Sequence, residues 1–162
     1  MTETILEGLQ APEFTLPDEK GNTITLEDFK GKQYVVLYFY PRDSTPGCTT
    51  EACDFRDRFP EFEKLQATVL GVSTDSAKKH QNFIAKNNLP FPLLVDAEAE
   101  AAKAYGVWKK KNMYGKEFEG IERSTFLIAP TGEVLKEWRK VKVAGHVEEI
   151  QQVLEQVQKE SS

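Results

Sequence analysis

The sequence lacks the residues and motifs that several large classes of protein require. Its 162 residues include only two cysteines and two histidines. A zinc site usually takes four ligands at a characteristic spacing, and the histidines lie far from the cysteines, so we expect neither a metal ion nor another cofactor. A G-x-S-x-G elbow and a glycine-rich phosphate loop are both absent, which argues against a hydrolase of that type and against a P-loop protein.

Charge and hydrophobicity exclude further partners. The chain carries 21 lysine and arginine residues against 26 aspartate and glutamate residues, a net charge of −5. This mild acidic excess offers no general attraction to nucleic acid or to an anionic membrane. No apolar run is long enough to span a bilayer, and residues 1–10, with two glutamates, do not resemble a secretory signal. We therefore expect a cytoplasmic protein that binds neither nucleic acid nor membrane.

The length of the chain fits one domain of ordinary size. Internal repeats, low-complexity tracts and linkers rich in glycine, serine or proline are absent, so we expect residues 1–162 to form a single domain. No long exposed apolar segment calls for a partner subunit, and a monomer is expected. In a reducing compartment a close pair of cysteines is typical of catalysis or redox sensing.

Apolar runs rich in β-branched and aromatic residues predict the strands. Residues 34–40, YVVLYFY, form a continuous apolar run of the kind found in a central strand buried on both faces. Similar, shorter or alternating segments predict six other strands: 13–16, 23–26, 67–73, 91–95, 124–129 and 134–141. We expect the first two of these to form a hairpin and the last to lie at an edge of the sheet.

Apolar residues at helical spacing predict the helices. Steps of four, three, four and three residues mark one helical face, formed by Cys48, Ala52, Phe55, Phe59 and Phe62. Pro60 should kink or restart this helix, and further helices are predicted at 76–87, 97–105 and 147–159. The order of elements predicts an α/β, thioredoxin-like fold with a mixed central sheet flanked by helices and an N-terminal hairpin extension.

Both cysteines lie where the central strand gives way to the first helix. Thr45 followed by Pro46 is typical of a helix start, with Thr as N-cap and Pro at the first helical position. Cys48 is then the third helical residue, where unpaired N–H groups and the helix dipole favour a thiolate over a thiol. Gly47 keeps side-chain bulk away from the sulfur. Because Cys48 also begins the apolar stripe, we expect its sulfur to point toward the sheet, in a pocket.

Simpler roles for these residues stay open. Thr45 could serve only as an N-cap, and Cys48 could be a buried structural thiol, although a second cysteine five positions on argues against that. The histidines His80 and His146 are expected at the surface, and neither is placed to form an obvious Cys-His pair.

Without a histidine, a thiolate needs another cation. Arg123 is the best candidate because it directly precedes the apolar strand 124–129, and an arginine is always charged and donates several hydrogen bonds. Arg42 is a weaker alternative, and the lysines at 109–111 are expected in a solvated loop. Glu51, one turn further along the helix, either favours the helix dipole or holds Arg123 in place.

The motif Pro41-x-x-x-Thr45-x-x-Cys48 resembles the active-site motif of the peroxiredoxins. The longer run 38–53, YFYPRDSTPGCTTEAC, is similar to the bacterioferritin comigratory protein subfamily, also called peroxiredoxin Q. Similarity extends over nearly the whole chain, through the Glu-Arg-Ser-Thr-Phe run at 122–126 to the C-terminal helix.

This resemblance implies a thiol-dependent peroxidase that reduces hydrogen peroxide and organic hydroperoxides. It implies that Cys48 is the peroxidatic residue and Cys53 the resolving residue, which together form an intramolecular disulfide that thioredoxin reduces. It further implies that Thr45 and Arg123 position and polarise the peroxide while Pro41 shields the sulfur from water.

Two other functions stay open on the residues alone. A thiol-disulfide oxidoreductase of thioredoxin type expects C-x-x-C, whereas four residues separate Cys48 from Cys53. A redox-regulated binding protein or holdase would use the disulfide to switch a surface. Peroxide consumption in the presence of a thioredoxin system discriminates among the three.

Overall fold

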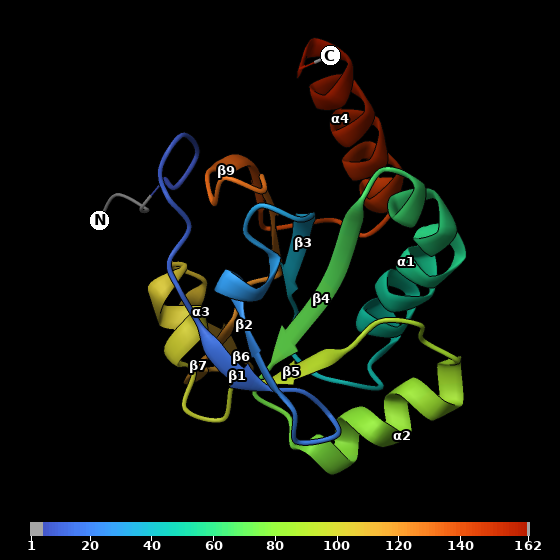
Figure 1. Cartoon of the computed structure of the whole chain (residues 1–162). Helices are drawn as coiled ribbons and strands as arrows, with labels where there is room; N and C mark the ends of the chain where they lie inside the picture. The colour runs from blue at the N-terminus through green and yellow to red at the C-terminus, as the bar shows by residue number, and fades with distance from the viewer. Residues whose placement is uncertain (1–4, 162) are drawn as a thin grey trace.

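The structure is a computed structural model that describes residues 5–161. Within these residues the centre is a five-stranded sheet made, in spatial order, of β5 (Leu93–Val95), β4 (Ala67–Ser73), β3 (Tyr34–Phe39), β8 (Ser124–Ile128) and β9 (Val134–Arg139) (Figure 1). The first three run parallel to one another, and β8 and β9 are antiparallel to their neighbours. The predicted mixed sheet, with its edge strand near the C-terminus, is confirmed.

The helices lie where the sequence predicts them. They are α1 (Pro46–Lys64), α2 (Ala77–Asn87), α3 (Glu100–Ala104) and α4 (His146–Ser161). Helix α1 continues through Pro60, so the helix does not restart there as one of the two predicted outcomes required. Pro60 is exposed, while Phe55 and Phe62 on the opposite side are buried against the sheet. Their burial offsets the cost of an interior proline, about 3 kcal/mol.

Helix α3 is shorter than the predicted segment 97–105 because a side chain fixes where it begins. The carboxylate of Asp96 accepts hydrogen bonds from the N–H groups of Ala101 and Ala102, at 3.2 and 2.9 Å. Ala99, before the first helical residue, has a left-handed backbone with φ of 56°. The aspartate therefore supplies the acceptors that the first turn of the helix needs.

The sheet is covered on both faces because alternate residues of β3 point to opposite layers. Val36 and Tyr38 belong to the cluster under α1 and α4. Val35, Leu37 and Phe39 pack instead with α3 and the N-terminal segment. Figure 1 shows α1 and α4 together on one side of the sheet and α3 on the other. Burial on both faces explains the continuous apolar run in the sequence.

The predicted N-terminal hairpin is confirmed. Strands β1 (Thr15–Pro17) and β2 (Thr23–Thr25) pair antiparallel. A short 3-10 helix, η1 (Leu26–Phe29), follows. It was not predicted, although its capping box between Thr25 and Asp28 is visible in the sequence.

A second hairpin replaces the predicted solvated loop at 109–111. It consists of β6 (Trp108–Met113) and β7 (Lys116–Ile121), paired antiparallel. Its turn residues Tyr114 and Gly115 both have positive φ, 54° and 77°, as the favoured two-residue hairpin turns require. Charged side chains dominate both strands, so the apolar alternation that predicts a strand is missing.

Among residues 5–161, no helix is long and apolar enough to cross a membrane.

Candidate active site

The junction between β3 and α1 brings several predicted site residues together. Thr45 is the N-cap of α1 by its extended backbone, but its side chain makes no capping hydrogen bond. The hydroxyl donates instead to the carbonyl oxygen of Arg42 at 3.1 Å. An N-cap serves a helix through its side-chain oxygen, so the interpretation of Thr45 as a mere cap loses its main support.

Cys48 lies in the first turn of α1 with its side chain turned toward the sheet. It is 1% exposed and packs in the apolar cluster that also holds Tyr38 and Ala52. The Nη2 of Arg123 donates a hydrogen bond to its sulfur at 3.2 Å. The prediction that Arg123 is the cation beside Cys48 is thus confirmed as a contact, whereas Arg42 is exposed and lines a cavity instead.

Glu51 holds Arg123 in place. Its Oε1 accepts from Nη1 of Arg123 at 2.6 Å, and its side chain is fully buried. Burial raises the pKa of Glu51 to about 7, although the guanidinium acts in the opposite direction. Burial also acts to lower the pKa of Arg123, but Glu51 and Cys48 outweigh it and raise that pKa. Of the two interpretations of Glu51, the structure favours the one in which it pins the arginine.

Gly47 makes room for the guanidinium. A Cβ added at this position would lie 3.1 Å from Nη2 of Arg123, closer than an ordinary van der Waals contact. The sequence predicted that Gly47 keeps bulk away from the sulfur. In the structure the group that needs this space is the Arg123 side chain.

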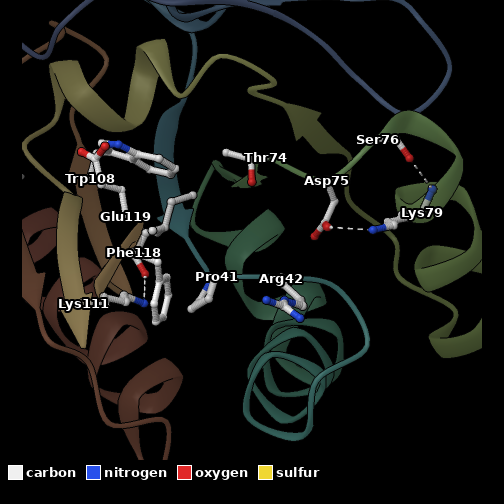
Figure 2. Close-up of a pocket in the computed structure, with 12 residues that line it drawn as sticks. Pro41, Arg42, Thr74, Asp75, Ser76, Lys79, Trp108, Lys111, Phe118 and Glu119 are labelled. Carbon is white, nitrogen blue, oxygen red and sulfur yellow. Dashed lines mark hydrogen bonds and ion pairs between the residues drawn. The ribbon is translucent and has the colours of Figure 1, made fainter. Parts of the chain in front are cut away.

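A cavity of about 530 Å³ lies beside the junction. It is lined by Pro41 and Arg42, whereas Cys48 is buried, so the expected pocket lies beside the proline rather than over the sulfur. Figure 2 shows the β6–β7 hairpin on one side of this cavity and the start of α2 on the other, with labelled side chains that include Trp108, Phe118, Asp75 and Lys79.

Lys111, expected in a solvated loop, lies at the cavity instead. Its Nζ donates to the carbonyl oxygen of Ile121 at 2.5 Å, and its side chain lines the cavity. Burial, and then the nearby Arg123 guanidinium, lower the pKa of Lys111. A second cation therefore lies near the site. The sequence signal that could have found it is Gly115, because a glycine between two short segments is typical of a two-residue hairpin turn.

Both histidines are buried, so the prediction that they lie at the surface is wrong. Each packs beside an aromatic ring and has a polar partner for at least one ring nitrogen. His80 contacts Asp43 at 2.6 Å and the carbonyl oxygen of Leu94 at 2.9 Å. His146 contacts the hydroxyl of Thr125 at 2.8 Å. Burial lowers the pKa of His146 to about 4.

Cys53 lies on α1 and is half-buried. Its sulfur is 3.8 Å from Oδ1 of Asn87, at the end of α2. Both cysteines are free thiols in this structure. Within residues 5–161, no cluster of three or more histidine, cysteine, aspartate or glutamate side chains is arranged to hold a metal ion.

Comparison with known proteins identifies the family. The model of the AhpC/TSA family matches residues 8–137. The peroxiredoxin Bcp of Bacillus subtilis is 58% identical over 151 residues, which cover 93% of this chain and 96% of the relative.

Solved structures agree with this assignment. A mutant of Xylella fastidiosa peroxiredoxin Q is 43% identical and superposes with a TM-score of 0.86, covering 100% of this chain and 99% of that one. The bacterioferritin comigratory protein of Xanthomonas campestris, described for its alkyl peroxide reduction activity, is 49% identical with a TM-score of 0.83, covering 88% of this chain and 90% of that one. The chain belongs to the AhpC/TSA family and, within it, to the bacterioferritin comigratory protein or peroxiredoxin Q subfamily of peroxiredoxins.

Proposed function

We propose that this protein is a thiol peroxidase that reduces hydrogen peroxide and organic hydroperoxides through Cys48. The observation that carries the proposal is the buried Cys48 sulfur in the first turn of α1, held 3.2 Å from the guanidinium of Arg123. A helix N-terminus and an arginine both stabilise a thiolate, which is the nucleophilic form of cysteine. The alkyl peroxide reduction activity described for the Xanthomonas campestris relative supports the assignment.

In the first step, the Cys48 thiolate attacks the terminal oxygen of the hydroperoxide. A sulfur–oxygen bond forms as the oxygen–oxygen bond breaks, and the leaving oxygen takes a proton and departs as water or an alcohol. Negative charge moves from the sulfur to the leaving oxygen. The Cys48 N–H and the Arg123 guanidinium are the donors that stabilise it, joined by the Thr45 hydroxyl once that group turns from the Arg42 carbonyl oxygen to the peroxide; each donor is worth about 3 kcal/mol.

Glu51 keeps Arg123 directed at the sulfur without cancelling its charge. Because the pKa of Glu51 is raised to about 7, the carboxyl is only partly ionised at neutral pH. The hydrogen bond to Nη1 orients the guanidinium, and at neutral pH the protonated fraction of the carboxyl group leaves the positive charge of Arg123 uncancelled. We assign to Pro41, which begins the loop 41–45 and lines the cavity, the role of shielding the sulfur from water.

In the second step, the Cys53 thiol condenses with the Cys48 sulfenic acid. A disulfide forms and water leaves. We propose that thioredoxin then reduces this disulfide by thiol–disulfide exchange, returning both thiols. We also propose that residues 1–162 act as one domain, as a monomer and in the cytoplasm; sedimentation of the reduced protein tests the monomer.

The alternative of a thioredoxin-type oxidoreductase has less support. Such an enzyme must present its attacking sulfur to a protein disulfide, and Cys48 is 1% exposed. A hydroperoxide needs far less access than a protein substrate.

Stopped-flow oxidation of the reduced protein tests the proposal. Trp108 lines the cavity and provides a fluorescence signal close to the site. We expect rapid oxidation by hydrogen peroxide and by a bulky organic hydroperoxide, followed by peroxide-dependent NADPH consumption with thioredoxin and its reductase. An oxidation rate no higher than that of a free thiol would contradict the peroxidase. Rapid oxidation without turnover would contradict only the proposal that thioredoxin is the reductant.

A further inference from the structure

The loop 41–45 between β3 and α1 is held by a buried hydrogen-bond network that the mechanism above does not use. Asp43 lies at its centre, with its side chain 3% exposed. Its Oδ1 accepts from the Tyr40 hydroxyl at 2.5 Å, and its Oδ2 lies 2.6 Å from Nδ1 of His80. The backbone N–H of Asp43 donates to Oδ2 of Asp75 at 2.6 Å. Hydrogen bonds to neighbouring residues thus hold both the side chain and the backbone of Asp43.

The partners of His80 determine where its protons lie. Nε2 is 2.9 Å from the carbonyl oxygen of Leu94, and because a carbonyl only accepts, Nε2 carries a proton. Nδ1 and the Asp43 carboxyl oxygen are 2.6 Å apart, so a proton lies between them as well. The pair is neutral overall whether this proton sits on nitrogen or on oxygen. A neutral, fully bonded pair is a contact that burial strengthens.

The network connects the loop to elements other than the helix that carries the cysteines. Tyr40 directly follows β3, and His80 belongs to α2. The imidazole ring of His80 contacts the carbonyl oxygen of Leu94 in β5. Asp75 follows β4 and accepts from the hydroxyl of Ser73 at 3.0 Å. In Figure 2, Asp75 lies across the cavity from Pro41, beside Lys79 of α2. The loop therefore has an anchor that does not depend on α1.

The backbone of the loop needs such an anchor. Ser44 has a φ of 64°, in the left-handed region that residues other than glycine adopt at a cost. Strained conformations of this kind persist only where the surrounding structure imposes them. Pro41 lies two residues before Asp43 and Thr45 two residues after it, so the position of Asp43 determines the position of both.

We propose that Asp43 and His80 are positioning residues for the peroxide reaction. By fixing the loop 41–45 against α2 and β5, they set where Pro41 and Thr45 stand relative to the Cys48 sulfur. The inference rests on the proposed peroxidase function of Cys48.

Two substitutions of one residue separate positioning from packing. In His80→Asn the side-chain amide takes the place of Nδ1 and still donates to Asp43. In His80→Gln it takes the place of Nε2 and donates to the Leu94 carbonyl, leaving Asp43 without this partner. We expect His80→Gln to slow oxidation of Cys48 by hydrogen peroxide by about tenfold to a hundredfold, because a displacement of about 1 Å can lower a rate by roughly a hundredfold. We expect His80→Asn to stay near the wild-type rate, with melting temperatures recorded for both.

Each outcome decides the matter. A wild-type rate in His80→Gln overturns the proposal, and so does equal slowing in the two variants, which would trace to lost packing. An unreactive wild-type protein contradicts the peroxidase function itself and is seen before any variant is tested.

If His80→Gln does not fold, Tyr40→Phe tests the same network, because it removes only the hydroxyl that donates to Asp43. We expect the oxidation of Cys48 to slow about threefold, as for one lost hydrogen bond. A wild-type rate there overturns the proposal.

Discussion

The two cysteines share one helix but have different surroundings. Cys48 is 1% exposed, and its sulfur accepts from Arg123, which Glu51 holds by a 2.6 Å contact. Cys53 is half-buried, and its sulfur has a long 3.8 Å contact with Asn87. The first environment is buried, hydrogen-bonded and charged, as stabilising a thiolate requires. The second holds its sulfur weakly, as a group that must move to react requires.

The segment around Cys53 is attached to its neighbours by partly exposed contacts. Arg56 donates to the carbonyl oxygen of Asn87 at 2.9 Å, and Arg58 donates to Gln151 at 3.0 Å. A hydrogen bond from a charged group contributes about 1.5–3 kcal/mol when buried and less when it is partly exposed, as these are. Unwinding this part of α1 therefore costs mainly the burial of its phenylalanine side chains.

Of the changes to the two cysteine environments, Cys48→Ser should lower the rate of peroxide reduction the most. A serine hydroxyl is not appreciably ionised at neutral pH, so peroxide reduction should fall below a few per cent of the wild-type rate. Coupled NADPH consumption measures this directly. Activity well above that level would place the nucleophile elsewhere.

Cys53→Ser should leave one turnover intact and abolish cycling. The Cys48 environment is unchanged, so the reduced variant should react with peroxide once and form a sulfenic acid that dimedone traps, detected by mass. Without Cys53 no intramolecular disulfide forms, and turnover with thioredoxin should be lost. Cycling at the wild-type rate would exclude Cys53 as the resolving residue.

Arg123→Met removes the cation that distinguishes the two environments. We expect the rate of Cys48 oxidation by hydrogen peroxide to fall about a hundredfold, the usual effect of losing one preorganised donor. Arg42→Met is the matched control, since Arg42 is exposed on the loop before the same helix. Equal rates for the two variants would assign the activation of Cys48 to the helix terminus alone.

Oxidation should melt the part of α1 that contains both cysteines. Within one helix, residues five positions apart have Cα atoms about 8.6 Å apart, whereas a disulfide needs about 4.4 to 6.8 Å. Because α1 is continuous over Pro46–Lys64, the bond requires unwinding, which we place at 47–58. Hydrogen exchange of the reduced and oxidised proteins should show lost protection over 49–59. Equal protection, with the disulfide confirmed by mass, contradicts this.

Glu51→Gln should change how stability depends on pH. Burial raises the pKa of Glu51 from 4.5 to about 7, so the folded protein retains a proton that the unfolded chain releases. The retained proton stabilises the folded protein by about 3 kcal/mol. This stabilisation is complete below pH 4.5 and is lost as the pH rises to 7. Relative to wild type, the unfolding free energy of the variant should therefore rise by about 3 kcal/mol between pH 4.5 and 7.5.

Because His146 also titrates in this pH range, the test must compare the unfolding free energies of Glu51→Gln and wild type at each pH. Its pKa is lowered from 6.5 to about 4, so it destabilises the fold as the pH falls through that range. In wild type this opposes the effect of Glu51, and urea denaturation of wild type alone would show little. A difference between variant and wild type that does not change with pH would mean that Glu51 titrates normally.

Much of the fold could be predicted from local pattern. The apolar run of β3 and the spacing of Ala52, Phe55 and Phe62 on α1 reflect burial, which acts on each segment separately. The β6–β7 hairpin could not be predicted this way, because its strands are charged and mostly exposed. The buried histidines were missed for a related reason: His80 is buried only because Asp43 and Leu94 supply its partners.

The local sequence is enough to predict the junction: a central strand, a helix beginning at Pro46 and Cys48 in its first turn. Caps and periodicity are local, so a short segment specifies them. The surroundings of the sulfur depend instead on tertiary contacts. Antiparallel pairing of β3 with β8 sets Phe39 opposite Ser124, which brings Arg123 beside a cysteine 75 residues away. Glu51 then meets that arginine in the core, where the absence of water makes the contact strong and raises the pKa of the carboxyl.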